Sequence, residues 1–236
     1  MTRPVPAPII PFACRRRAAL VLPAAAVLAP GAVAQNTAVD LLLVLAVDAS
    51  GSIDPAEFRL QREGCAEALT HPTVLSAIAA RPRGAIAVAM VEWGAPGGAA
   101  TVVDWHRVDG AAAAETLARA VLAAPRSRQS WNAIGDALDH AAALIAAAPF
   151  RADERVIDLS GDAPDMRGLR PVALARADAA AAGIMVNALA IEGDRAGLAE
   201  TYGQTVIAGP GAFVVAADNR QDFARAMRAK LVREIA

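Results

Sequence analysis

The sequence is poor in aromatic residues, cysteine and lysine. Only 4% of its 236 residues are aromatic, two are cysteines, and Lys230 is the single lysine. So few aromatic side chains leave few platforms on which bases or sugars could stack. The 23 Lys and Arg residues against 24 Asp and Glu give no basic excess for nucleic acid. Since two cysteines cannot build a disulfide framework either, we expect neither a nucleic-acid-binding protein nor a disulfide-stabilised scaffold.

What the chain has in excess is apolar residues, mostly alanine and small aliphatics. Hydrophobic residues make up 56% of the sequence and charged residues 20%, which excludes a disordered tail protein. Small apolar side chains pack helices closely against a sheet. The length fits one globular domain with, at most, a terminal segment added to it.

The first 34 residues have the order of a secretory signal peptide. A basic patch, Arg15–Arg17, precedes the apolar stretch Ala18–Leu28, and Ala32-Val33-Ala34 suits a cleavage site before Gln35. The apolar stretch is too short to cross a bilayer. We therefore expect an exported bacterial protein, periplasmic or secreted, with a signal peptide at 1–34. The mature chain, residues 35–236, is then a mildly acidic domain without a transmembrane segment. The alternative interpretation of the first residues is a core helix followed by a loop.

Strand-like and helix-like patterns alternate about six times along the mature chain. The first, 39–47, is an almost unbroken apolar run, as in a central parallel strand covered on both faces. The alternation predicts an α/β fold, a doubly wound, Rossmann-like three-layer α/β/α sandwich around a mostly parallel sheet of about six strands. The expected strands are 39–47, 85–93, 101–108, 155–160, 184–191 and 212–216, and the expected helices are 55–69, 111–124, 133–147, 171–182, 194–202 and 218–235.

Oxygen side chains alternate in the loop that follows the first strand. Asp48, Ser50 and Ser52 would point the same way from an extended loop. One carboxylate and two hydroxyls suit Mg²⁺, Mn²⁺ or Ca²⁺ and do not suit zinc, which prefers His and Cys. In doubly wound sheets, ligands bind beyond the carboxyl ends of the strands, where the strand order reverses. The polar loops 130–132 and 161–165 could meet the first loop there.

These residues resemble the von Willebrand factor type A (vWA) domain. The resemblance rests on the Asp-x-Ser-x-Ser motif after a hydrophobic first strand, an acid after the fourth main strand, and the doubly wound alternation. More narrowly, five segments resemble a bacterial family of exported vWA-like proteins known mainly as a domain of unknown function. They are VDLLLVLAVDASGSID, VAMVEW, RVIDLSGDAPD, GPGAFV and AMRAKLVREIA, and the resemblance spans roughly 39–236.

The resemblance implies a metal-ion-dependent adhesion site in this chain. It assigns Asp48, Ser50 and Ser52 to the first metal loop and Asp162 to the last. Asn132 stands where the family has a threonine before a Gly-x-Ala-Leu helix start, and an amide oxygen can also ligate a hard cation. The implied cofactor is a divalent cation, with Mg²⁺ first and Mn²⁺ or Ca²⁺ as the other choices. Asp162 acts either directly or through a bridging water.

The resemblance also implies a protein partner and no catalysis. Two carboxylates leave a divalent ion incompletely neutralised, so a carboxylate from the partner would complete its shell. Ser130, Trp131 and Asp165 lie beside the expected ligands in sequence and are the predicted partner contacts. Ser130 is also the nearest hydroxyl that could replace the missing threonine, whereas Asp165 is not expected to ligate the metal directly. Trp131 could instead pack the loop, and no oligomeric state follows from the sequence.

Other interpretations of the same residues remain open. Asp48, Ser50 and Ser52 could form a helix N-cap with turn residues, and Asn132 could cap the next helix. An acid at the tip of the first strand also begins a class of phosphohydrolases, but Ser50 occupies the position of their second Asp. A vWA scaffold that binds partners without a metal is the third possibility.

Two residues inside the expected elements carry structural predictions. Asp158 lies within a strand, where a lone acid is costly to bury, so we expect it to pair with an arginine or with backbone donors. Cys65, which would have no partner after removal of Cys14 with the signal peptide, is expected to be a small buried helix residue.

Overall fold

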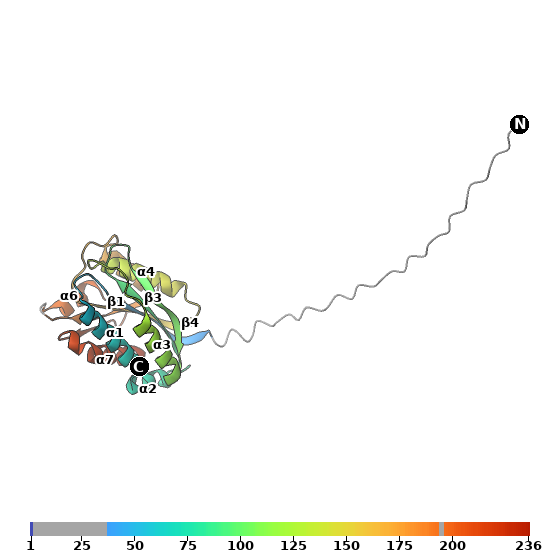
Figure 1. The fold of residues 1–236 in the computed structure, drawn as a ribbon, viewed down its shortest axis with the longest axis horizontal. Helices are drawn as coiled ribbons and strands as arrows, with labels where there is room; N and C mark the ends of the chain where they lie inside the picture. Colours follow the sequence, from blue (N-terminus) through green and yellow to red (C-terminus); the bar gives the residue numbers. More distant parts are fainter. Residues whose placement is uncertain (2–36, 194–195) are drawn as a thin grey trace.

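A six-stranded sheet runs through the middle of the molecule, with helices on both of its faces (Figure 1). The computed structural model describes residues 37–193 and 196–236, together with Met1, so the predicted signal peptide, apart from Met1, lies outside the described residues. The strands are β1 (Ala38–Asp48), β2 (Ile86–Trp93), β3 (Ala100–Val108), β4 (Arg151–Gly161), β5 (Met185–Ile191) and β6 (Val214–Ala217).

The strand order is β3-β2-β1-β4-β5-β6, and only β3 runs antiparallel to its neighbour. The chain builds outward from β1 in one direction through β2 and β3, then returns to the other side of β1 with β4. The order therefore reverses between β1 and β4, which is where a doubly wound sheet opens a crevice for ligands. The predicted three-layer α/β fold is confirmed, and β3, the strand predicted at 101–108, lies at the edge of the sheet.

The helices divide between two apolar layers. On one face lie α1 (Pro55–Thr70), α2 (Pro72–Ala80), α3 (Ala111–Ala123) and α7 (Phe223–Ile235), and on the other lie α4 (Ile134–Ala146), α5 (Val172–Ala181) and α6 (Leu198–Thr205). The side chains of β1 alternate between the two layers, with Leu43 and Leu45 in the first and Val44 and Ala46 in the second. This explains why the β1 sequence is apolar at nearly every position.

The start of α1 is fixed by a capping box. Asp54 accepts hydrogen bonds from the backbone N–H groups of Ala56 (2.7 Å) and Glu57 (2.8 Å), while the Glu57 carboxylate accepts from Asp54 N (2.9 Å). Pro55 suits the first helical position, because proline has no backbone N–H that would need a hydrogen-bond partner there. The helix therefore begins only after the Asp-x-Ser-x-Ser loop has ended. Cys65 is buried on this helix with a free thiol, as predicted.

The elements differ from the predictions mainly at their ends. The helix α2 was not predicted; His71 ends α1 and at once caps α2, whose first residue is Pro72. β4 begins four residues earlier than predicted. Its first residues are mostly polar and exposed, and this hides the strand pattern in the sequence. The last helix is shorter than predicted, since Arg220–Asp222 forms a separate 3₁₀ turn, η1. The helix predicted from 194 begins at Leu198, and residues 194–195 lie outside the described residues.

A buried ionic cluster joins α7 to the sheet. The Lys230 ammonium group lies 2.6 Å from the Asp158 carboxylate of β4 and also pairs with Glu234, and all three side chains are excluded from solvent. Asn187 of β5 donates a hydrogen bond to Glu234 (2.9 Å). The prediction that Asp158 pairs with an arginine or backbone donors is therefore wrong. Its partner is the chain's single lysine, 72 positions later, which only the packing of α7 brings to β4.

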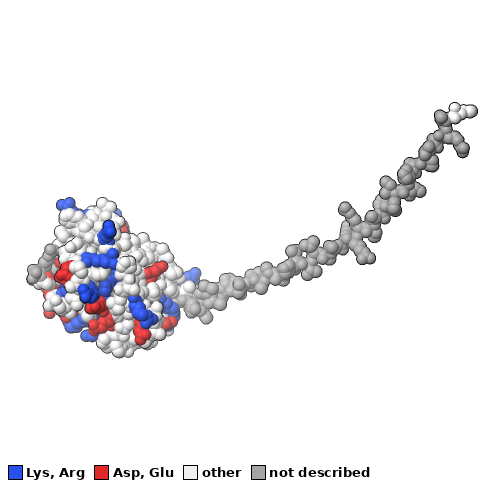
Figure 2. Space-filling view, viewed as in Figure 1, with Lys and Arg blue, Asp and Glu red and all other residues white. Residues whose placement is uncertain are grey.

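The face of the molecule seen in Figure 2 carries basic and acidic residues side by side rather than a surface of one sign. This mixture agrees with the near balance of charges in the sequence. Among the described residues, no helix is both long and apolar enough to cross a membrane.

Substitution of Gly135 by alanine is expected to destabilise the fold. Gly135 lies on α4, and a Cβ there would overlap the carbonyl group of Arg170 on the β4–α5 loop. We expect a loss of about 3 kcal/mol in the free energy of unfolding, measured by urea denaturation. Gly203→Ala on α6 is the matched control, because a Cβ there meets only Val214 Cγ2 at 4.0 Å. Equal stability of the two variants would contradict this packing.

Candidate metal centre

Asp48 ends β1 at the point where the strand order reverses, and its side chain is fully buried. Its Oδ1 accepts a hydrogen bond from Ser50 N (2.8 Å), and its Oδ2 accepts one from Asn132 Nδ2 (3.0 Å). Asn132 lies in the loop before α4, so one carboxylate joins the first and second predicted metal loops. The structure thus brings Asp48, Ser50 and Asn132 together.

The two serine hydroxyls of the first loop face each other. Ser50 Oγ and Ser52 Oγ are 3.2 Å apart, with Ser50 buried and Ser52 exposed. Neither residue caps α1, since Asp54 does so. The alternative interpretation of Asp48, Ser50 and Ser52 as a helix cap is therefore wrong. These residues lie in the loop that follows β1, at the carboxyl edge of the sheet.

Asp162 follows β4 and lies next to Asp48. The second oxygen of its carboxylate accepts a hydrogen bond from Arg220 Nη2 (2.5 Å), while Oδ1 is buried and has no hydrogen-bond partner among the described residues. The Arg220 guanidinium also contacts Glu57, with Nε 2.8 Å from Oε1. An orphaned carboxylate oxygen beside a second carboxylate is costly in a buried setting, because both prefer a cation or a donor.

The electrostatics of the centre couple the two carboxylates. Burial, and to a smaller extent the nearby charge of Asp162, raise the pKa of Asp48 from its ordinary value of 3.8 to about 7. The hydrogen bond from the Ser50 backbone acts in the opposite direction but is weaker. At neutral pH the site therefore attracts either a proton or a cation.

Asn132 is buried, and its neighbours in the second loop are exposed. It does not cap α4, because Asp165 takes that role by accepting a hydrogen bond from Ile134 N (2.8 Å). Burial raises the pKa of Asp165, which has this capping contact and no described contact with Asp48 or Asp162. The interpretation of Asn132 as a cap is thus wrong.

Trp131 and Ser130 lie at the rim of the centre. Trp131 is 46% exposed and has a backbone φ of 61°, a left-handed conformation that is uncommon for a bulky residue. Its ring stacks with the guanidinium of Arg167, whose carbon lies 4.1 Å from the ring centroid. Arg167 also has a positive φ, of 60°. The Trp131 ring therefore stays on the surface instead of packing into the loop, and Ser130 is exposed beside it.

Three residues of the centre were not found from the sequence: Glu57, Arg126 and Arg220. Arg126 Nη2 donates to the backbone oxygens of Ala49 (3.2 Å), Ser50 (3.1 Å) and Ile53 (2.8 Å), so it ties the second loop to the first. No local pattern marks these residues, because each reaches the centre only through the tertiary fold. Their arrangement explains how the loops keep their shape.

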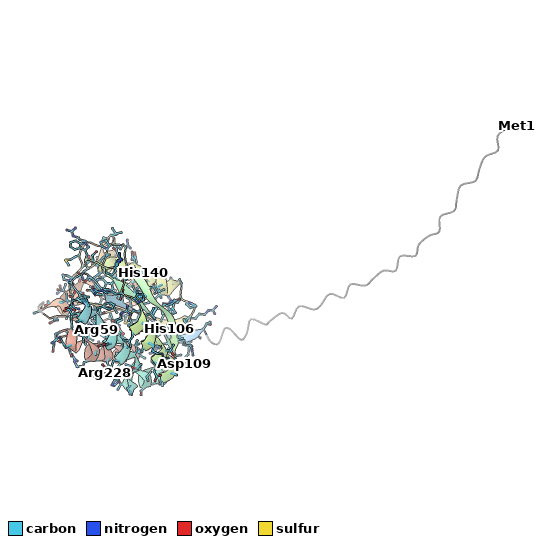
Figure 3. All side chains as sticks on the ribbon, in the orientation of Figure 1. Met1, Arg59, His106, Asp109, His140 and Arg228 are labelled. Atoms are coloured by element: carbon cyan, nitrogen blue, oxygen red, sulfur yellow. The ribbon has the colours of Figure 1, made fainter. Side chains whose placement is uncertain are left out.

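The described residues contain no group of three or more His, Cys, Asp or Glu side chains that could hold a metal ion. His106 lies on β3 and His140 on α4, and Figure 3 shows them on these separate elements. His140 Nε2 is 3.0 Å from Thr101 Oγ1, and His71 caps α2. Any cation at the carboxyl edge would therefore depend on the mixed oxygen set of two acids, two hydroxyls and an amide.

The sequence of residues 38–236 matches a protein family described as "protein of unknown function (DUF1194)". The chain belongs to the DUF1194 family. No curated protein matches it in sequence. The family match covers every strand of the sheet and every helix described above.

Solved structures show that this DUF1194 chain has a vWA-type fold. It is similar to the pilus adhesin SpaC from Lactobacillus rhamnosus GG (15% identity, TM-score 0.61, 84% of this chain and 30% of that chain). It is also similar to a von Willebrand factor type A protein from Catenulispora acidiphila (18%, 0.59, 84% and 43%). A third match is a structure of proximal thread matrix protein 1 from the mussel byssus whose metal-ion-dependent adhesion site (MIDAS) motif is occupied by zinc. The identity is 15% and the TM-score 0.58, over 84% of this chain and 46% of that chain. The chain spans less than half the length of each of these proteins.

Proposed function

We propose that this DUF1194 protein is an exported, non-enzymatic module that binds a protein partner through a divalent cation. Asp48, Ser50, Ser52, Asn132 and Asp162 would hold the cation at the carboxyl ends of β1 and β4. The proposed partner supplies a carboxylate to the same ion. Mg²⁺ is the proposed ion, with Mn²⁺ and Ca²⁺ as probes of the same oxygen set.

The single observation that carries the proposal is the pair Asp48 and Asp162. Two carboxylates meet in a buried site, one with a pKa raised to about 7 and the other with an orphaned oxygen. Two serine hydroxyls 3.2 Å apart lie in the same loop as Asp48. A hard divalent cation fits this donor set, since it would neutralise the acids and take up their unused oxygens. The mussel protein with a zinc-occupied MIDAS motif has the same fold and supports the proposal by analogy.

The chain's own residues would prepare the centre and the partner surface. Asp48 orients Asn132 through its hydrogen bond, and Arg126 holds the loop carbonyls, so the donors are fixed before a partner arrives. A bound cation would supply a positive charge that a partner carboxylate can ligate. Trp131 and Ser130 are proposed to contact the partner at the rim, with Asp165 fixing the start of α4 below them.

The absence of turnover is proposed on two grounds. The solved structures of this fold include a pilus adhesin and a thread matrix protein, both named for binding or structural roles. Lys230, the single lysine, could not supply a positive charge for phosphohydrolase chemistry at the carboxyl edge, because its ammonium group is buried against Asp158 and Glu234.

Titration of the purified protein with Mn²⁺ by isothermal calorimetry tests the cation proposal. We expect saturable binding, with Ser50→Ala weakened about tenfold because a hydroxyl ligand is lost. Ser76→Ala, on the exposed side of α2, is the matched control and should bind as the wild type does. Mg²⁺ and Ca²⁺ are expected to compete with Mn²⁺. A wild type that binds none of the three ions would refute the proposal.

A further inference from the structure

Arg220 places a positive charge at the centre from a segment outside the three predicted metal loops. It lies on η1, after β6, and only 12% of its side chain is exposed. Its guanidinium forms two contacts with acids, Nη2 to Asp162 (2.5 Å) and Nε to Glu57 (2.8 Å). Arg220 is thus a fixed and nearly buried counter-ion of a proposed metal ligand.

The same carboxylate cannot serve the guanidinium and a divalent cation equally well. A cation bound by Asp162 would lie within a few ångströms of the guanidinium, and two positive charges at that distance repel strongly in a buried site. Even a cation on the unused Oδ1 would share the negative charge of Asp162 with the guanidinium on the other oxygen, which weakens both interactions. Cation binding therefore has to overcome the Arg220 contact.

Glu57 decides how strongly Arg220 is held at Asp162. Its Oε1 contacts the guanidinium, while its Oε2 accepts a hydrogen bond from Asp54 N in the capping box of α1. Glu57 is thereby fixed at the start of the helix that follows the first metal loop. Glu57 and Asp162 both pair with the Arg220 guanidinium, so Glu57 provides a second carboxylate to which Arg220 can stay bound.

We propose that Arg220 sets the cation affinity of the centre, by competing as an internal cation for Asp162, and that Glu57 moderates this competition. The inference rests on the proposed function. A cavity of about 370 Å³ borders the pair and is lined partly by Glu57, Asp162 and Arg220, so the guanidinium has space to withdraw from Asp162. The intrinsic affinity of the oxygen ligands is then higher than the affinity that the whole protein shows.

Mn²⁺ titration of four variants tests this inference. Arg220→Gln removes the competing charge and is expected to bind Mn²⁺ about tenfold more tightly than the wild type. Arg220→Lys retains the charge and should remain within about threefold. Glu57→Gln leaves the guanidinium to Asp162 alone and should weaken binding about threefold, while glutamine can still complete the capping box. Arg225→Gln on α7, whose arginine pairs with Asp222, is the matched charge control and should match the wild type.

Thermal unfolding without added cation provides the second measurement. Because Arg220→Gln leaves Asp162 unpaired, its midpoint should fall below that of the wild type, although its cation affinity rises. A purely structural arginine would lower the midpoint without tightening Mn²⁺ binding, and that result would overturn the inference. If Arg220→Gln does not fold, unchanged or tighter binding by Glu57→Gln would overturn it instead. Absence of Mn²⁺ binding in every protein, wild type included, would refute the cation proposal itself.

Discussion

Substitution of Asp48 by asparagine is expected to stabilise the cation-free protein at pH 8 and to abolish its response to divalent cations. The wild-type carboxylate is fully buried and faces Asp162, and its pKa is raised to about 7. In the unfolded chain the same group has its ordinary pKa of 3.8. Between pH 3.8 and about 7, Asp48 is protonated in the folded protein but ionised in the unfolded chain. The contribution of Asp48 to stability is therefore lost as the pH rises through this range.

An amide at this position carries no charge at any pH. The variant and the wild type should therefore have similar stability near pH 4, and the variant should be more stable at pH 8, by on the order of 2 kcal/mol. The amide oxygen can still accept the hydrogen bond from Ser50, and the NH₂ group can donate one to the orphaned Oδ1 of Asp162 in place of the hydrogen bond that Oδ2 accepts from Asn132. Urea denaturation at several pH values, with and without 5 mM of Mg²⁺ as roughly a saturating level, measures both effects.

Asp40→Asn is the matched control for this prediction. Asp40 is also a buried acid of β1, but it lies at the other end of the strand, where it accepts the backbone N–H of Arg83 and pairs with its side chain (3.5 Å). Its substitution should destabilise the protein and leave the cation response intact. A cation response that survives in Asp48→Asn would argue for a vWA scaffold that does not use this centre.

The sequence could predict the part of the centre that depends on strand order. A buried strand such as β1 is visible as an apolar run, and its end places Asp48 at the carboxyl edge of the sheet. Asp162 follows from the same logic, because parallel neighbours end at one edge. The alternation of Asp48, Ser50 and Ser52 then indicates the first loop. These residues were found because local pattern and topology point to the same place.

The rest of the centre depends on contacts between segments that are distant in sequence. Arg220 is 58 positions from Asp162, and its role follows from the path of the chain after β6. Asp165 looks like a second loop acid, but it is the packing of the β4–α5 loop on α4 that makes it a helix cap. The partner of Asp158 was mistaken for the same reason, since charge pairing predicts the need for a cation but not which one.

Loss of Lys230 is expected to have the largest effect on stability of any single substitution considered for this protein. Its ammonium group is the only cation described between Asp158 and Glu234 in the buried cluster beneath α7. Lys230→Met keeps most of the side-chain volume but leaves two carboxylates facing each other without a counter-charge. Removing one partner of a buried ion pair typically costs about 3–5 kcal/mol. We expect a loss of this size in the free energy of unfolding at pH 8.

The pH dependence of this loss separates an ionic from a packing effect. Burial and the charge of Asp158 already raise the pKa of Glu234 to about 7 in the presence of the lysine. In the variant, protonation of Glu234 at pH 5 removes the repulsion between the two carboxylates, so the destabilisation should shrink as the pH falls from 8 to 5. Arg228→Met, on the same helix with a partly exposed side chain 3.9 Å from Glu67, should cost under about 1 kcal/mol at both pH values. A loss in Lys230→Met that is independent of pH would mean that α7 is held by apolar packing, with the ionic cluster contributing little.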